Sequence, residues 1–104
     1  MTLDGLINWL ENQDQSMIVK DGFSSPHSDR GDYQDLAFTP EQTSKISDML
    51  KHAQSALGAT FQGWKGGDFK MEGWTDVYIG DFGECGEEIT SHTLKYWLLT
   101  GKGK

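Results

Sequence analysis

Apolar residues recur at helical spacing near both ends of the chain. The first stripe predicts a short amphipathic helix over residues 3–12, with Thr2 placed to act as its N-cap. The last stripe predicts a closing helix over about residues 87–99. The residues on the two stripes are Leu3, Leu6, Ile7 and Leu10 in the first helix, and Ile89, Thr93, Leu94, Trp97 and Leu98 in the last.

The strongest helical pattern lies in the middle of the chain. Thr39 is a favourable N-cap, Pro40 suits the first helical position, and Gln42 completes a capping box. An apolar stripe then continues to Gly58, which suits the left-handed position that ends a helix. The stripe consists of Ile46, Met49, Leu50, Ala53 and Leu57. We therefore expect a helix over residues 40–57.

The rest of the chain has the shorter period of β-strands, or no period. A brief strand is expected over residues 17–20, and the polar, unpatterned residues 21–34 predict a long loop. Three further short strands predict an antiparallel meander, and they lie at residues 59–62, 68–71 and 74–79. This order predicts an α+β fold in which about three helices pack on one face of a small antiparallel sheet. Residues 1–104 are expected to form a single domain, with a frayed tail at 101–104.

The charge and cysteine content narrow the kinds of partner and compartment. The formal net charge is −7, which disfavours non-specific binding to nucleic acid or to an anionic membrane surface. Cys85 is the only cysteine, so neither an internal disulfide nor a multi-thiolate zinc site is expected. The sequence has no apolar run long enough for a membrane span and no secretory signal, so we expect a cytoplasmic protein.

The first candidate site lies in the predicted loop, around the only arginine of the chain. Arg30 can hold a phosphate or carboxylate through paired N–H donors, Tyr33 can stack on a base, and His27 and Ser28 can contact polar edges of a ligand. The alternative is that Arg30 forms salt bridges that order the loop. Its possible partners are Asp29, Asp32 and Asp35.

The second candidate site lies between two of the predicted strands. Gly66 and Gly67 allow backbone N–H groups to approach an anion closely, Lys65 supplies positive charge, and Trp64 offers a stacking surface. The segment lacks the strand-to-helix context of a phosphate-binding P-loop. The alternative is a glycine turn of a hairpin, with Lys65 in solvent.

The cysteine gives a weaker basis for chemistry. Cys85 would lie at the start of the closing helix, where the helix dipole favours a thiolate, but the neighbouring carboxylates oppose it. A packed, unreactive cysteine is the simpler interpretation. Glu88 and His92, one helical turn apart, would complete a three-ligand metal site with Cys85, but this spacing often arises by chance. No metal or other cofactor is expected.

Several short motifs occur together over most of the chain. They are Gly22-Phe23, Pro26-His27-Ser28, Arg30-Gly31, Tyr33, Leu36-Ala37-Phe38, Met49-Leu50, Ala56-Leu57-Gly58-Ala59-Thr60, Lys65-Gly66-Gly67-Asp68-Phe69 and Cys85-Gly86-Glu87-Glu88. In this combination they resemble a family of small uncharacterised proteins from bacteriophages and prophages. The resemblance implies a phage origin and names no reaction.

A phage origin favours proteins that act on host machinery. We expect a non-enzymatic anti-defence protein that sequesters a small anionic, nucleotide-derived immune signal as a homo-oligomer, because a domain this small has little depth of its own. One alternative is a protein–protein inhibitor of a host defence or replication factor, which would use acidic loops and exposed aromatic residues. Another is a small cysteine-dependent or metal-binding enzyme.

Overall fold

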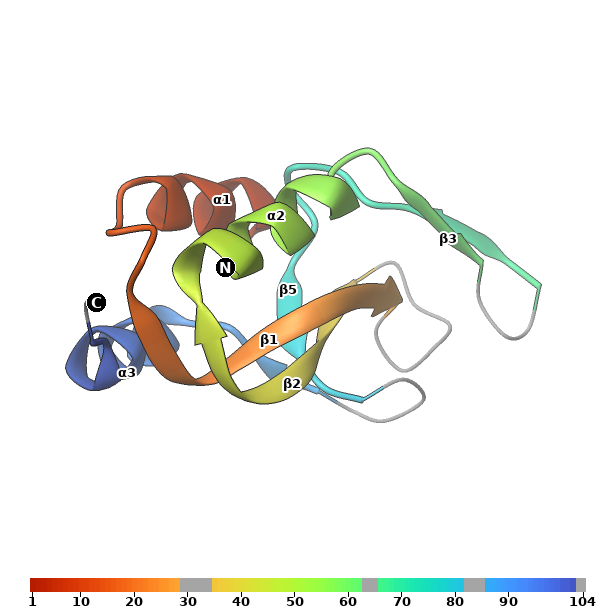
Figure 1. Cartoon of the computed structure of the whole chain (residues 1–104). Helices are drawn as coiled ribbons and strands as arrows, with labels where there is room; N and C mark the ends of the chain where they lie inside the picture. Colours follow the sequence, from red (N-terminus) through yellow and green to blue (C-terminus); the bar gives the residue numbers. More distant parts are fainter. Residues whose placement is uncertain (29–34, 63–65, 82–85, 103–104) are drawn as a thin grey trace.

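A computed structural model describes residues 1–28, 35–62, 66–81 and 86–102. The described residues form three helices separated by groups of strands (Figure 1). The elements are α1 (Leu3–Glu11), β1 (Ile18–Ser28), β2 (Leu36–Lys45), α2 (Ile46–Ala56), β3 (Thr60–Gln62), β4 (Asp68–Lys70), β5 (Val77–Ile79), β6 (Glu87–Glu88) and α3 (Ser91–Thr100). The predicted α+β class, a small sheet with helices, is confirmed.

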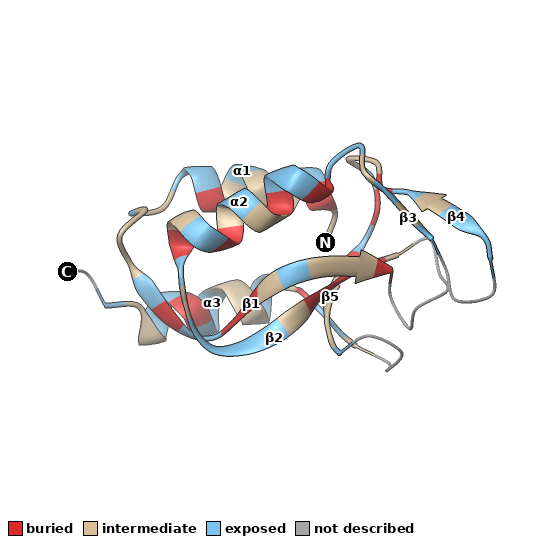
Figure 2. Ribbon diagram, turned by 45° about the vertical axis from the view of Figure 1, so that its right-hand side comes forward, coloured by how far each residue is buried: buried red, intermediate tan, exposed pale blue. Residues whose placement is uncertain are grey.

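α1 forms where the first apolar stripe predicts it. The side chain of Thr2 accepts a hydrogen bond from the backbone N–H of Gly5 at 3.2 Å, which satisfies one of the free donors at the helix N-terminus. Leu3, Leu6 and Leu10 are fully buried. α1 lies beside α2 above the β1–β2 hairpin (Figure 1 and Figure 2), so its apolar stripe contributes to the core.

The main sheet is mixed and is not a meander. β1 and β2 pair antiparallel, β2 and β5 pair parallel, and β6 pairs antiparallel with β5, which gives the strand order β1-β2-β5-β6. β3 and β4 form a separate antiparallel hairpin. The meander prediction is wrong in its last step, because β5 leaves the β3–β4 hairpin and pairs with residues Leu36, Ala37 and Phe38 of β2.

The β1–β2 hairpin occupies residues that the sequence pattern assigns to a loop and a helix. β1 extends to Ser28, so the loop predicted over residues 21–34 is wrong up to that residue. The helix predicted over residues 40–57 is wrong in its first third, because α2 begins only at Ile46. The residues before it pair with β1 across the hairpin, and this long-range pairing overrides the local capping signal.

The end of α2 confirms the prediction for Gly58. This residue has a φ angle of +80°, a left-handed conformation that glycine adopts without steric cost. Its backbone N–H donates a hydrogen bond to the carbonyl oxygen of Met71 at 2.7 Å. The helix end is thereby tied to the chain that follows β4.

α3 begins later than the sequence pattern predicts. Residues Glu87–Glu88 form β6, so the closing helix predicted over residues 87–99 is wrong at its start. Thr90 and Thr93 instead form a reciprocal capping box at the N-terminus of α3. Neither this helix nor any other in the described residues is long and apolar enough to cross a membrane.

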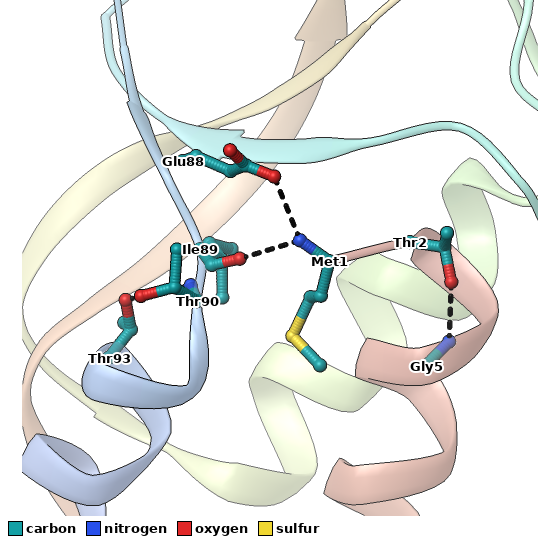
Figure 3. Close-up of polar contacts among 7 residues, drawn as sticks. All are labelled: Met1, Thr2, Gly5, Glu88, Ile89, Thr90 and Thr93. Atoms are coloured by element: carbon teal, nitrogen blue, oxygen red, sulfur yellow. Dashed lines mark hydrogen bonds and ion pairs between the residues drawn. The ribbon is translucent and has the colours of Figure 1, made fainter.

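The first residue of the chain is held beside β6 (Figure 3). The ammonium group of Met1 donates hydrogen bonds to Oε2 of Glu88 at 3.0 Å and to the carbonyl oxygen of Ile89 at 2.9 Å. The carbonyl oxygen of Met1 accepts a hydrogen bond from the N–H of Val77 at 3.1 Å. These contacts join the chain start to β5 and to the segment before α3.

Aromatic rings connect the helices to the sheet. The ring of Phe23 stacks on that of Phe38, with centroids 4.1 Å apart. The ring of Trp97 lies 5.9 Å from that of Phe23 and 5.9 Å from that of Trp9. Phe23, Phe38 and Trp97 are all buried, so β1, β2 and α3 share one hydrophobic core.

Candidate functional site

The first predicted ligand segment begins at the end of β1, where its two described residues contact the protein itself. Nε2 of His27 lies 2.9 Å from the carbonyl oxygen of Gly80, and Nδ1 lies 3.0 Å from that of Ser28. A neutral imidazole donates to only one of two such oxygens, whereas an imidazolium donates to both. Ser28 is only 1% exposed. A ligand-binding role for these residues stays a prediction.

The second predicted segment is described at its glycines. Gly66 has a φ angle of +94°, and Gly67 is exposed directly before β4. Both features suit a turn between β3 and β4, which is the alternative interpretation of this segment. The remaining predicted ligand-binding residues lie outside the described part of the chain, so the convergence of the two segments stays a prediction. They are Arg30, Tyr33, Trp64 and Lys65.

The alternative of a metal site requires Glu88 and His92 to lie one turn apart on the same helix. Glu88 belongs to β6 and His92 to α3, so they do not share a helical face as the sequence pattern predicts. Cys85 lies outside the described residues. Among the residues that the structure describes, no group of three His, Cys, Asp or Glu side chains is arranged to hold a metal ion.

A cleft of about 450 Å³ lies between the β1–β2 hairpin and α2. Small-molecule sites typically measure roughly 300–1,000 Å³. In Figure 1, α2 lies above the hairpin, and β2 runs directly into its first turn. β1 contributes Phe23 and Ser24 to the cleft, β2 contributes Glu41 and Lys45, and α2 contributes Lys51 and His52.

Three basic side chains line this cleft. Lys45 ends β2 and precedes the first turn of α2, while Lys51 and His52 follow on the helix. Asp48 lies three and four residues before Lys51 and His52, a spacing at which helical side chains meet. Within the described part of the chain, however, neither lysine forms an ion pair. Both ammonium groups are therefore available to an anionic ligand.

The hairpin side of the cleft carries a positioned carboxylate. The hydroxyl of Ser24 donates a hydrogen bond to Oε2 of Glu41 at 2.7 Å. Ser24 lies in an irregularity of β1, where two residues between Phe23 and Pro26 oppose one residue of β2. Such a bulge redirects side chains relative to a regular strand. The cleft therefore presents basic side chains from the end of β2 and from α2, and a hydrogen-bond acceptor from the hairpin.

The sequence interpretation does not identify this cleft. Lys45, Lys51 and His52 fall within the helix predicted over residues 40–57 and are not among the ligand-binding residues predicted from the sequence. The one available signal is that three basic residues occur within eight positions of a chain with net charge −7. The hydrogen-bond acceptor, Glu41, has no local sequence signal, because its contact with Ser24 depends on pairing between β1 and β2.

A second cleft, also of about 450 Å³, has an acidic rim that includes Asp21 and Glu87. The hydroxyl of Tyr96 donates a hydrogen bond to Oδ2 of Asp21 at 2.6 Å. This hydrogen bond is the main cause that raises the pKa of Tyr96, and desolvation and the negative charge of Asp21 act in the same direction. Among the described residues, four carboxylates and no lysine line this cleft, whereas two carboxylates and two lysines line the cleft beside α2. The cleft beside α2 is therefore the candidate site for an anionic ligand.

Comparisons with known proteins found no relative of this chain. No protein-family model, no curated protein and no solved structure matches the chain. The resemblance to phage proteins stays a prediction, and the functional argument rests on the cleft and its residues.

Proposed function

We propose that this protein is a non-enzymatic binding protein for a small anionic, nucleotide-derived ligand. One observation carries the proposal: Lys45, Lys51 and His52 line a single cleft, and neither lysine is paired with a carboxylate among the described residues. Two lysines that have no ion-pair partner among the described residues favour phosphate, because charge-assisted hydrogen bonds to an ion are stronger than neutral ones. Phe23 adds an apolar surface to the same cleft.

The biological role that we propose is sequestration of an immune signal in the cytoplasm of a phage-infected host cell. The phage resemblance supports this role, and the cleft supplies a place for the signal. The role requires tight binding without turnover of the ligand.

Calorimetric titration with ADP-ribose, AMP, a cyclic dinucleotide and inorganic phosphate tests the proposed function. We expect at least one nucleotide to bind. The double variant Lys45→Ala with Lys51→Ala should lower the affinity for that nucleotide by about tenfold or more. Lys95→Ala is the matched control, because Lys95 is exposed on α3 and lines neither cleft. Absence of binding by the whole panel would sink the proposal.

A second double variant compares the cleft with the site that the sequence predicts. Arg30→Ala with Lys65→Ala removes the cations of the two predicted segments and leaves the cleft intact. If the ligand binds at the cleft, this variant keeps the affinity of the unmodified protein for the ligand. A loss confined to the Arg30 and Lys65 variant would place the ligand at the predicted segments instead.

Exposed apolar side chains favour a second candidate function, inhibition of a host protein. Trp74 is 67% exposed and Leu99 is 85% exposed. Large apolar side chains in solvent are typical of protein interfaces. If the protein acts in this way, it recovers one stoichiometric partner from host lysate, and Trp74→Ala or Leu99→Ser reduces the recovery. Recovery that neither substitution changes would count against an interface at these residues.

A further inference from the structure

Two carboxylates line the cleft that we propose for an anionic ligand. Asp48 lies one helical turn from Lys51 and His52, whereas Glu41 is exposed on β2 and also lines the second cleft. Its negative charge repels a phosphate, so a cleft that bound only phosphate would be better without it. A carboxylate does favour a ligand that also offers hydroxyl donors, because an ionised carboxylate is a pure acceptor with two oxygens.

The geometry of Glu41 fits this acceptor role. The hydroxyl of Ser24 donates to Oε2 at 2.7 Å and fixes the orientation of the carboxylate. Oε1 has no hydrogen bond or ion pair to any residue in the described part of the chain. Ser24 reaches Glu41 from the bulge in β1, so the fold itself places this acceptor.

We infer that the ligand carries a free ribose diol, and that Glu41 accepts hydrogen bonds from its hydroxyls while Lys45 and Lys51 hold the phosphate. The inference rests on the proposed function and narrows it. An acidic side chain that binds ribose hydroxyls is a general device of nucleotide-binding sites. A mononucleotide or ADP-ribose offers the free diol. A 3′,5′-linked cyclic dinucleotide does not, because its O3′ atoms are esterified to phosphate.

The test compares AMP with 2′,3′-dideoxy-AMP by calorimetry on the full chain. We expect the unmodified protein to bind AMP about five- to tenfold more tightly. Glu41→Gln keeps the shape of the side chain and removes its charge. In this variant the affinity for AMP falls, while the affinity for 2′,3′-dideoxy-AMP stays the same or rises because a repulsive charge is lost. A merely structural role would lower both affinities together.

Two controls and the outcomes complete the design. Glu11→Gln removes another exposed carboxylate, at the end of α1, and leaves both affinities unchanged. Ser24→Ala frees the Glu41 carboxylate and weakens AMP binding more than 2′,3′-dideoxy-AMP binding.

Equal binding of the two nucleotides by the unmodified protein overturns this inference and leaves the proposed function standing. Binding of the cyclic dinucleotide alone also overturns only this inference, whereas absence of binding by every member of the panel overturns the two together.

Discussion

Asp21 connects β1 to α3 through both its backbone and its side chain. Its φ angle is +53°, in the left-handed region that aspartate tolerates better than most side chains. Its carbonyl oxygen accepts a hydrogen bond from Nε1 of Trp97 at 3.1 Å, and its carboxylate accepts one from the hydroxyl of Tyr96. A single residue with unusual backbone geometry therefore anchors the last helix.

The Tyr96 hydrogen bond predicts a pH dependence of stability above neutral pH. The folded state holds the tyrosine proton more tightly than the unfolded state, because the hydrogen bond to Asp21 raises the pKa of Tyr96. The contribution of this hydrogen bond to stability is complete at a pH below about 10, the pKa of tyrosine in the unfolded state. It is lost as the pH rises through the pKa of Tyr96 in the folded state. We therefore expect the thermal midpoint of the unmodified protein to fall more steeply above pH ~10 than that of Tyr96→Phe.

A second variant separates this hydrogen bond from the loss of a tyrosine. Asp21→Asn keeps Tyr96 and suits the left-handed backbone, because asparagine also adopts it readily. It replaces the charged acceptor by a neutral and weaker one, so its alkaline profile should lie between those of the unmodified protein and of Tyr96→Phe. Melting curves by circular dichroism between pH ~8 and ~11 provide the measurement. Parallel profiles for the unmodified protein and both variants would refute the assignment.

Single residues also explain why the cleft could not be predicted from the sequence. The sequence points to side chains with unusual neighbours, such as Arg30, but a cleft needs side chains from several elements. Lys45 and Lys51 are ordinary exposed lysines until β2 turns into α2 beside the hairpin. Ser24 and Glu41 are seventeen positions apart and meet only through strand pairing.

At the scale of elements, the close packing of β1 against β2 and α2 depends on Gly22. A Cβ atom at this position would lie 2.5 Å from Cβ of Ser44 and 3.0 Å from Sδ of Met49. Since Cβ of Ser44 is fixed by its backbone, the strand itself would have to move. We expect Gly22→Ala to lower the free energy of unfolding by about 1–3 kcal/mol, the range for overpacked cores.

Gly67→Ala is the matched control for this prediction. A Cβ atom at Gly67 would make only ordinary contact with the ring of Phe69, at 3.5 Å. We expect this exposed substitution to change the free energy of unfolding by less than about 0.5 kcal/mol. Urea denaturation of both variants measures the difference. Equal losses would show that the packing at Gly22 does not limit stability.

The elements themselves were predictable where local signals and tertiary contacts agree. α1 has both a cap and an apolar stripe, and it forms as predicted. The capping signal at Thr39 and Pro40 fails because both residues lie in β2, where Pro40 pairs with Phe23 of β1. Proline is tolerated there, because the pairing of β2 with β5 ends at Phe38 and leaves β2 with one neighbouring strand beyond that residue. Pairing between strands that are distant in the sequence has no local sequence signal.

At the scale of the whole molecule, size and charge point to a small ligand. The radius of gyration is 12.9 Å, close to the value of about 13 Å for a compact domain of this length. The molecule is nevertheless longer in one direction, 43 Å against 22 Å and 20 Å, and the β3–β4 hairpin extends from one end in Figure 1. The net charge of −7 spreads over this small surface, so positive potential is confined to local clusters of basic residues.

This charge distribution predicts that a mononucleotide binds while a nucleic acid duplex does not. A mononucleotide places one phosphate near Lys45 and Lys51, within a Debye length of about 8 Å at physiological salt. A duplex brings many phosphates against the acidic remainder of the surface, and the counterion release that normally drives such binding needs many cationic contacts. Fluorescence anisotropy with a labelled DNA duplex should therefore show no binding tighter than about 100 μM at physiological salt. Micromolar binding with a steep salt dependence would mean that a larger basic surface exists, and the ligand would then have to be sought among nucleic acids.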